Sequence, residues 1–388
     1  MIRKSMIILA AVAMMSSCSH RYVKPSASSG PANTADANLE FALEFFKKTN
    51  QTVPYDENLV LSPYSAGVAL SMLEVGSDGE TKAELDDALN GHLFAAEDLG
   101  SGEDLTVKSA NSLWISDNFS IRNRYVSLLQ KDYDAFVTTQ DFSEKTTVQE
   151  INNWCGENTN GKINHILDEL SPNDVMVLIN ALYFNAPWAQ AFDEKATTDM
   201  TFHGISEDKK VPMMSAKAHF DYAEYQGCQL IRLPYAGGRY SMVVVLPPEG
   251  WGVDAILPYV SGTVYKGAMQ MLSKKEVIFR LPKFKLETGL VLDKALKKMG
   301  IETAYTPAAD FKGISAMGPL SLGTVKQKCY IDVTEKGTEA AAVTSVQVRL
   351  TSVSPVSVAR MTVDRPFLFF ISDSQTANVL FVGKVVNL

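Results

Sequence analysis

Residues 335–352 combine residue types and a spacing that are typical of a β-strand. Side chains two positions apart lie on the same face of an extended strand. One face of this stretch starts with small uncharged residues and becomes apolar: Thr338, Ala340, Ala342, Thr344, Val346, Val348 and Leu350. The other face is mostly polar and carries Glu339 and Arg349. Loop-forming residues follow, so this segment has the position of a loop and the pattern of a strand.

Since Glu339 and Arg349 fall on the mostly polar face, we expect both to remain in solvent. The alternative, an ordinary edge strand of about 13 residues, exceeds the usual strand length.

The side chains that most often perform catalysis form no recognisable motif. None of the five histidines lies in a GxSxG, HExxH, P-loop or dinucleotide-binding pattern. We therefore expect no enzyme activity, no cofactor and no metal site. Three cysteines remain after the N-terminal segment, and an odd number cannot all pair in disulfides. They form no CxxC motif, so we expect Cys155, Cys228 and Cys329 to be small core residues.

The composition describes a globular protein without a nucleic-acid partner. The 388 residues are 46% hydrophobic, which is enough for a large core, and the formal net charge is −8. Binding to nucleic acid needs a basic surface, and no dense cluster of Lys and Arg offsets the acidic balance.

The N-terminus has the pattern of an export signal. Arg3 and Lys4 precede an apolar run over residues 6–15, which is too short to span a membrane, and small residues then lead to Cys18. The segment 1–18 resembles a bacterial lipoprotein signal, in which the cysteine becomes the lipidated first residue. The alternative is an ordinary secretory signal that is cut nearby.

Residues 19–35 read as a flexible tether, and residues 36–388 as one domain. A lipidated Cys18 would be the domain's link to a membrane. We expect an exported cell-envelope lipoprotein, either periplasmic or on the cell surface.

Helical patterns prevail in the first 165 residues and strands later, which indicates an α+β fold rather than alternating βαβ units. Residues 175–184 form a nearly continuous apolar run, typical of a strand covered on both faces. Helices are predicted over 37–49, 63–76, 125–133, 151–162 and 288–300, and from 79 onward. Strands are predicted over 111–115, 136–142, 175–184, 230–234, 240–246, 277–282, 362–370 and 379–386.

A set of segments, in the same order, resembles the serpin family over roughly residues 36–388. No single segment is decisive, but the ordered set is very specific. The segments are NLVLSPYSAGVALSMLEVGSDGET at 58–81, NSLW at 111–114, INNWCGENTNGKI at 151–163, LINALYFNAPW at 178–188, VPMM at 211–214, LPYAGGRYSMVVVLPPE at 233–249, LPKFKLETGL at 281–290, DFKGIS at 310–315, GTEAAA at 337–342 and DRPFLFFI at 364–371.

The resemblance implies one domain with three β-sheets, about nine helices and an exposed reactive loop at about 335–360. It also implies a protease inhibitor that acts as a suicide substrate. The target protease cleaves the loop, forms a covalent acyl-enzyme, and is trapped when the loop inserts into the central sheet. Net backbone hydrogen bonding is worth on the order of 1 kcal/mol per bond, so a dozen inserted residues would gain roughly 10 kcal/mol before packing. A buried charge on the inserted face would cost several kcal/mol against that gain. The chain would act as a monomer. The alternative is a serpin-fold carrier or chaperone that inhibits nothing.

Counting within the resemblance places the reactive bond. Family members usually have a hinge Glu seventeen residues before the cut, and Glu335 in that role puts the cut between Thr351 and Ser352. A small Thr would suit an elastase-like serine protease, and a papain-like cysteine protease is a further candidate. Cleavage after Arg349 would indicate a trypsin-like target, and cleavage after Leu350 a chymotrypsin-like one. The resemblance assigns the hinge to Glu335, Gly337, Thr338, Ala340, Ala341, Ala342 and Thr344.

The resemblance also implies a polar cluster where the central sheet opens. Ser62, Ser65 and Asn180 match its positions, and Gln327 stands where many members have a His. Because an amide does not titrate near neutral pH, we expect this cluster to hold the sheet closed without a pH-sensitive member.

Overall fold

The computed structural model describes residues 34–100, 105–171, 174–317, 320–339 and 358–388. Residues from Asn33 to Leu388 form one compact unit. The predicted signal, Cys18 and most of the tether lie outside the described residues. No helix in the described parts of the chain is both long and apolar enough to cross a membrane.

The described residues form eight α-helices, three short 3-10 helices and fifteen strands, so the expected α+β class is confirmed. The α-helices are α1 (Thr34–Asn50), α2 (Pro63–Glu74), α3 (Gly79–Ala88), α4 (Asn123–Tyr133), α5 (Lys145–Asn158), α6 (Val253–Ile256), α7 (Gly262–Met271) and α8 (Asp293–Lys298). The strands are β1 (Leu59–Leu61), β2 (Thr106–Ser116), β3 (Phe136–Gln140), β4 (Met176–Pro187), β5 (Thr198–His203), β6 (Asp208–Tyr225), β7 (Cys228–Pro234), β8 (Tyr240–Leu246), β9 (Ser273–Pro282), β10 (Phe284–Val291), β11 (Thr324–Val333), β12 (Gly337–Thr338), β13 (Ala359–Thr362), β14 (Phe367–Asp373) and β15 (Val379–Val385).

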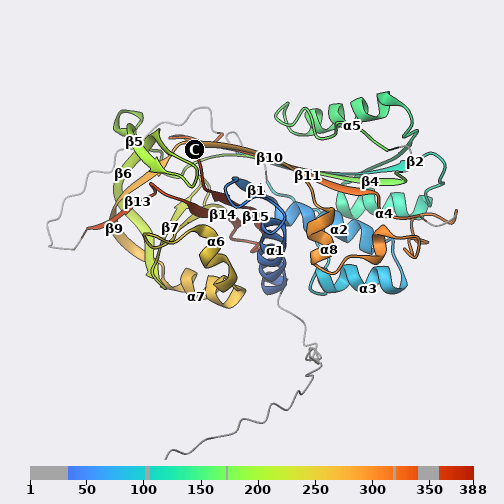
Figure 1. The fold of residues 1–388 in the computed structure, drawn as a ribbon, viewed down its shortest axis with the longest axis horizontal. Helices are drawn as coiled ribbons and strands as arrows, with labels where there is room; N and C mark the ends of the chain where they lie inside the picture. Colours follow the sequence, from blue (N-terminus) through green and yellow to red (C-terminus); the bar gives the residue numbers. More distant parts are fainter. Residues whose placement is uncertain (1–33, 101–104, 172–173, 318–319, 340–357) are drawn as a thin grey trace, which may run out of the picture. The chain divides into compact units, whose positions relative to one another are not determined.

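The strands are arranged around one central sheet. Its order is β10-β11-β12-β4-β2-β3, and β11 also pairs with β4. The other strands form a continuous ladder in which the long strand β6 pairs with β5 through its first residues and with β7 through its last. Because β6 contributes to two groups of strands, the architecture has three sheets, as expected. In Figure 1 the helix α5 covers one face of the central sheet, and α2, α3 and α8 lie on the other side.

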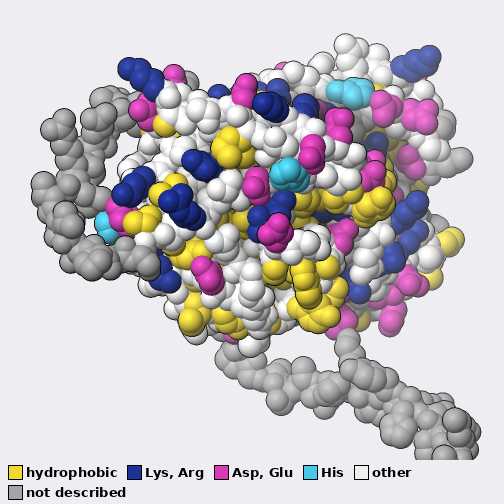
Figure 2. Space-filling view, turned by 60° about the vertical axis from the view of Figure 1, so that its left-hand side comes forward, with side chains coloured by type: hydrophobic (Ala, Val, Ile, Leu, Met, Phe, Trp, Pro, Cys, Tyr) yellow, Lys and Arg dark blue, Asp and Glu magenta, His cyan; other side chains and the backbone are white. Residues whose placement is uncertain are grey.

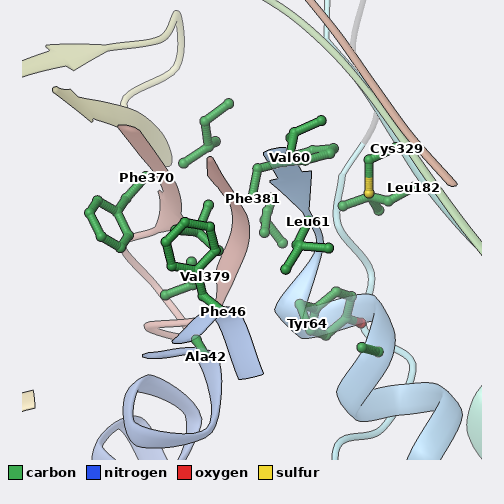
Figure 3. Close-up of a cluster of buried hydrophobic side chains, with 14 of the residues drawn as sticks. Ala42, Phe46, Val60, Leu61, Tyr64, Leu182, Cys329, Phe370, Val379 and Phe381 are labelled. Atoms are coloured by element: carbon green, nitrogen blue, oxygen red, sulfur yellow. The ribbon is translucent and has the colours of Figure 1, made fainter. Parts of the chain in front are cut away.

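Strand β4 is buried on both faces, which confirms the reading of its apolar run. Met176, Leu178 and Leu182 belong to the main core. Val177 and Ile179 belong to a second cluster on the α5 side. Figure 3 shows part of the main core, where side chains of α1 and β15, such as Phe46 and Phe381, meet those of β1 and α2. The sheet is therefore fixed between two apolar layers, and its strands can separate only by disturbing them.

Several predicted boundaries differ from the observed ones by a few residues, and three differences have a clear physical cause. The helix predicted over 151–162 is α5, which starts at Lys145 and ends at Asn158, since Asn160 and Gly161 adopt left-handed backbone angles. The helix predicted over 288–300 is split: residues 288–291 continue β10 by pairing with β11, and only α8 is helical. The strand predicted over 362–370 is also divided, because Pro366, which has no N–H to donate, lies between β13 and β14.

Candidate functional site

The two central strands of the sheet, β4 and β11, are parallel and pair directly over a short stretch. The paired positions run from Thr324 opposite Val177 to Cys329 opposite Leu182. Beyond this stretch β12 lies between them and is antiparallel to both, with Thr338 opposite Val333 on one side and Ala186 on the other. The sheet therefore has a closed part and a part where a third strand has entered.

A tight turn delivers the chain from β11 into β12. The N–H of Thr334 donates to the carbonyl of Gly337 over 2.9 Å. Gly337 has a φ of +155°, and a Cβ there would overlap the carbonyl oxygen of Ala186. Only glycine fits at this point, because the hinge backbone lies directly against β4.

Thr338, predicted to be on the buried face of the loop, is completely buried in the described structure. Its hydroxyl lies 2.6 Å from the hydroxyl of Tyr235, whose ring stacks on Trp188 at 4.5 Å. Trp188 in turn donates its indole N–H to the carbonyl of Thr334 over 2.9 Å. The start of the hinge is thus part of the sheet and is held by an aromatic pair.

Glu335, the predicted hinge glutamate, is a buried ion-pair partner. Its carboxylate lies 2.9 Å from Lys283 and accepts a hydrogen bond from the Thr197 hydroxyl at 2.8 Å. Burial is the largest single influence on its pKa and acts to raise it, but the hydrogen bonds from Lys283, its own backbone and Thr197 together outweigh burial. The pKa of Glu335 is therefore lower than usual, and the carboxylate stays charged.

The expectation that Glu339 remains in solvent is wrong. Its side chain is only 10% exposed and forms an ion pair with Lys162, in the segment that follows α5. The alternation correctly places Glu339 on the face opposite Thr338, but protein covers that face. Glu339 also has a φ of +56°, so β12 stops there, although its N–H still donates to Asp332 over 2.7 Å.

The four residues predicted for the polar cluster lie together, fully buried, beneath the closed part of the sheet. The side-chain amide of Gln327 makes a reciprocal pair of bonds with the backbone of Ser62, at 2.9 and 3.0 Å. It also donates to the Oδ1 atom of Asn180, directly across the β4–β11 pairing, at 2.8 Å. Ser62 caps α2 by accepting from the N–H of Ser65. This cluster thus ties both central strands to one helix N-terminus.

Two members of this cluster were missed by the sequence reasoning. Asn180 donates to the Oδ1 atom of Asn111 at 2.6 Å, and the hydroxyl of Ser65 lies 3.2 Å from that of Ser109. Both additions come from β2, where Asn111 is directly opposite Asn180. The motif NSLW contained Asn111, but its polar side chain on an apolar strand was the only signal of a partner.

The remaining predicted site residues lie outside the described residues. They are Ala340, Ala341, Ala342, Thr344, Arg349, Leu350, Thr351 and Ser352. Their roles therefore remain predictions.

The described residues include three free cysteines, which differ in burial. Cys155 and Cys329 are buried, and burial raises the pKa of the Cys155 thiol to about 12. Cys228 is half-buried, in contrast to the expectation of a core residue. Within the described ranges no group of three or more His, Cys, Asp or Glu side chains could hold a metal ion.

Comparison with known proteins defines the class of the chain. The model of the family Serpin (serine protease inhibitor) matches residues 36–388, so the chain belongs to the serpin family of protease inhibitors and is not an enzyme. Among its relatives, leukocyte elastase inhibitor A of Mus musculus is 32% identical over 90% of this chain and 98% of its own length.

Two solved structures have the same fold. The thermophilic serpin tengpin in its native state has a TM-score of 0.84 and 31% identity, over 93% of this chain and 95% of its own. Human thyroxine-binding globulin in complex with thyroxine has a TM-score of 0.83 and 28% identity, over 91% of this chain and 98% of its own.

The buried position of Asn180 leads to a stability prediction. Asn180→Leu keeps the volume but leaves Gln327 and Asn111 without their partner, so we expect the free energy of unfolding to fall by about 2–5 kcal/mol. Urea denaturation measures it. The control Asn118→Leu, on an exposed turn, should change it by less than about 0.5 kcal/mol. Equal effects of the two substitutions would contradict the role of the cluster.

The lowered pKa of Glu335 leads to a pH prediction. Because its folded-state pKa is below the unfolded value of about 4.3, the carboxylate stabilises the fold above that pH and loses this effect as pH falls through the folded-state value. Glu335→Gln should cost about 1–3 kcal/mol at pH 7, measured by urea denaturation, and progressively less below about pH 4. Glu194→Gln, at an exposed carboxylate 3.8 Å from Lys336, is the control. A cost that is the same at pH 7 and pH 3 would refute the argument.

Proposed function

We propose that this chain inhibits a protease as a suicide substrate whose cleaved loop inserts between β4 and β11. The observation that carries the proposal is β12, a short antiparallel strand seated between two parallel strands at the point where their direct pairing ends. Further insertion would replace one parallel pairing with two antiparallel pairings, which are slightly more stable per residue. Each further loop residue that pairs with β4 and β11 would therefore lower the free energy of the protein.

The covalent complex would form by the protease's own catalytic mechanism. Its nucleophilic Ser or Cys attacks the carbonyl carbon of Thr351, the peptide bond to Ser352 breaks, and the new amine of Ser352 takes up a proton. The carbonyl is left as an ester or thioester on the protease. Water would normally release it, but insertion of residues 339–351 would carry the linked protease away from the position in which it can deacylate. One monomer would be consumed for each protease.

Thr351 as the residue before the cut supports an elastase-like target. A small side chain suits a shallow primary pocket, and one relative is itself named a leukocyte elastase inhibitor. A papain-like protease also forms an acyl-enzyme. Cleavage after Arg349 or Leu350 would shift the target to a trypsin-like or chymotrypsin-like protease.

The second candidate function is that of a carrier without inhibitory activity. It is supported by the likeness to thyroxine-binding globulin, a protein solved with thyroxine bound. The hinge argues for inhibition instead, because Thr338 is already accommodated between the central strands and the next residues on its face, Ala340 and Ala342, are small.

We also propose that Cys18 is lipidated and that the chain is exported to the cell envelope. The support is the basic start, the apolar run over 6–15 and the small residues before Cys18. In cells fed labelled palmitate, the chain should incorporate the label, and Cys18→Ala should abolish incorporation. Undiminished labelling of that variant would rule out Cys18 as the site.

The inhibitory function is tested by mixing the protein with elastase, trypsin, chymotrypsin and papain. We expect an SDS-stable covalent complex with elastase, and a released C-terminal peptide whose mass shows that it begins at Ser352. A peptide that begins at Leu350 or Thr351 would move the reactive bond. Cleavage by all four proteases without any stable complex would favour the carrier.

The insertion step has its own matched pair of variants. Thr338→Arg places a charge where the side chain is completely buried, so cleavage should continue while the yield of covalent complex falls by about tenfold or more. Thr338→Val keeps the shape and loses only the contact with Tyr235, and it should retain most of the complex. Equal yields from the wild type and Thr338→Arg would contradict insertion.

A further inference from the structure

An apolar cavity of about 310 Å³ lies away from the hinge, between α6 and α7 on one side and β7, β8 and β14 on the other. No Asp, Glu, Lys or Arg is among the described residues that line it. In Figure 2, hydrophobic side chains gather on the lower part of the face that carries α6 and α7. The cavity is thus lined by uncharged side chains.

The walls of the cavity are fixed by regular structure. Leu230, Val245 and Phe370 come from three neighbouring strands, and Val264 and Ala268 face them from α7. The ring of Tyr265 meets that of Phe370 edge-on at 5.1 Å, which fixes α7 against the sheet. Because strands and a helix build it, the cavity exists before any ligand arrives.

The rim of the cavity is aromatic. Trp251 is 52% exposed and Tyr259 is 68% exposed, and both line the cavity. One wall is the β6–β7 turn, where Gln226 and Gly227 have positive φ angles and Gly227 lies against Pro248. Tyr225, at the end of β6, and Gln226, in this turn, both line the cavity. They are among the few lining residues whose side chains carry polar groups, which a ligand could use for orientation.

Size and charge together define the occupant. A cavity of about 150 Å³ lined by apolar side chains accommodates benzene, so a cavity twice as large matches a molecule of two or three rings. A charged ligand would be desolvated there without a counter-charge, at a large cost. Flat aromatic surfaces are favoured by the exposed Trp and Tyr rings at the rim.

We propose that this cavity binds an uncharged aromatic or alicyclic small molecule of two or three rings, held between α7 and the sheet and oriented by Gln226 and Tyr225. The site is separate from the hinge, so it is independent of the proposed inhibition, and either can fail without the other.

The test uses the uncharged naphthalene dye prodan with the full chain. We expect saturable binding at one site, with a Kd on the order of 10 µM, seen as increased and blue-shifted dye fluorescence. The same ring system carrying a carboxylate should bind at least tenfold more weakly. No saturation up to the solubility limit of the dye, or equal binding of the charged analogue, would overturn the proposal.

Location is tested by variants and by a chemical footprint. Ala268→Met partly fills the cavity and should raise the Kd at least tenfold. Tyr259→Ser should also raise it, whereas Tyr55→Ser, at a tyrosine that is 66% exposed but outside the cavity, should leave it unchanged. If Tyr55→Ser weakens binding as much as Tyr259→Ser, the dye binds elsewhere.

Protection of Cys228 from alkylation can be measured on the wild-type protein. This test therefore does not depend on whether the variants fold. Cys228 lines the cavity and is half-buried, and it can be alkylated by N-ethylmaleimide and followed by peptide mass spectrometry. Saturating prodan should slow alkylation of Cys228 by about fivefold or more. An unchanged alkylation rate at saturation would place the dye outside this cavity and contradict the proposal.

Discussion

The architecture depends on one short interaction, the direct parallel pairing of β4 with β11. Six register pairs close the sheet there, and the amide contact between Gln327 and Asn180 joins the same two strands from below. The contact is completely buried and every bond is neutral, so it holds the strands together without a group that titrates near neutral pH. If the pairing were longer, β12 would have no place to enter. If it were shorter, fewer backbone hydrogen bonds would join β4 to β11.

The hinge is held by charge on both sides of this entry point. Glu335, within the turn, forms an ion pair with Lys283, and Glu339, after the turn, forms one with Lys162. Between them, Gly337 and Thr338 are the only residues of β12. For the strand to extend, Glu339 must leave its left-handed conformation and become extended. The ion pair with Lys162 therefore lies directly after β12 and connects the hinge to the segment that follows α5.

Much of this arrangement could be predicted from the sequence, because it rests on local patterns and ordered motifs. The apolar run of β4, the cap at Ser62 and the members Asn180 and Gln327 all lie where they were expected. The burial of Glu339 could not be predicted, because alternation separates the two faces of a strand but does not say what covers each face. The apolar cavity could not be predicted either, because its lining residues come from two distant parts of the sequence, 225–268 and 368–370. The reactive bond at Thr351 lies outside the described residues and remains a prediction.

The most direct measurement of the central claim compares thermal unfolding of the protein before and after a single cut within residues 340–357. Insertion of a dozen residues would add roughly 10 kcal/mol in backbone hydrogen bonds. For a chain of 388 residues the entropy of unfolding is roughly 0.8 kcal/mol/K, so each kcal/mol raises Tm by about 1.2 °C. The cleaved protein should therefore melt at least about 12 °C above the intact one. A cleaved protein that melts at the same temperature as the intact one, or lower, would show that the loop does not enter the sheet.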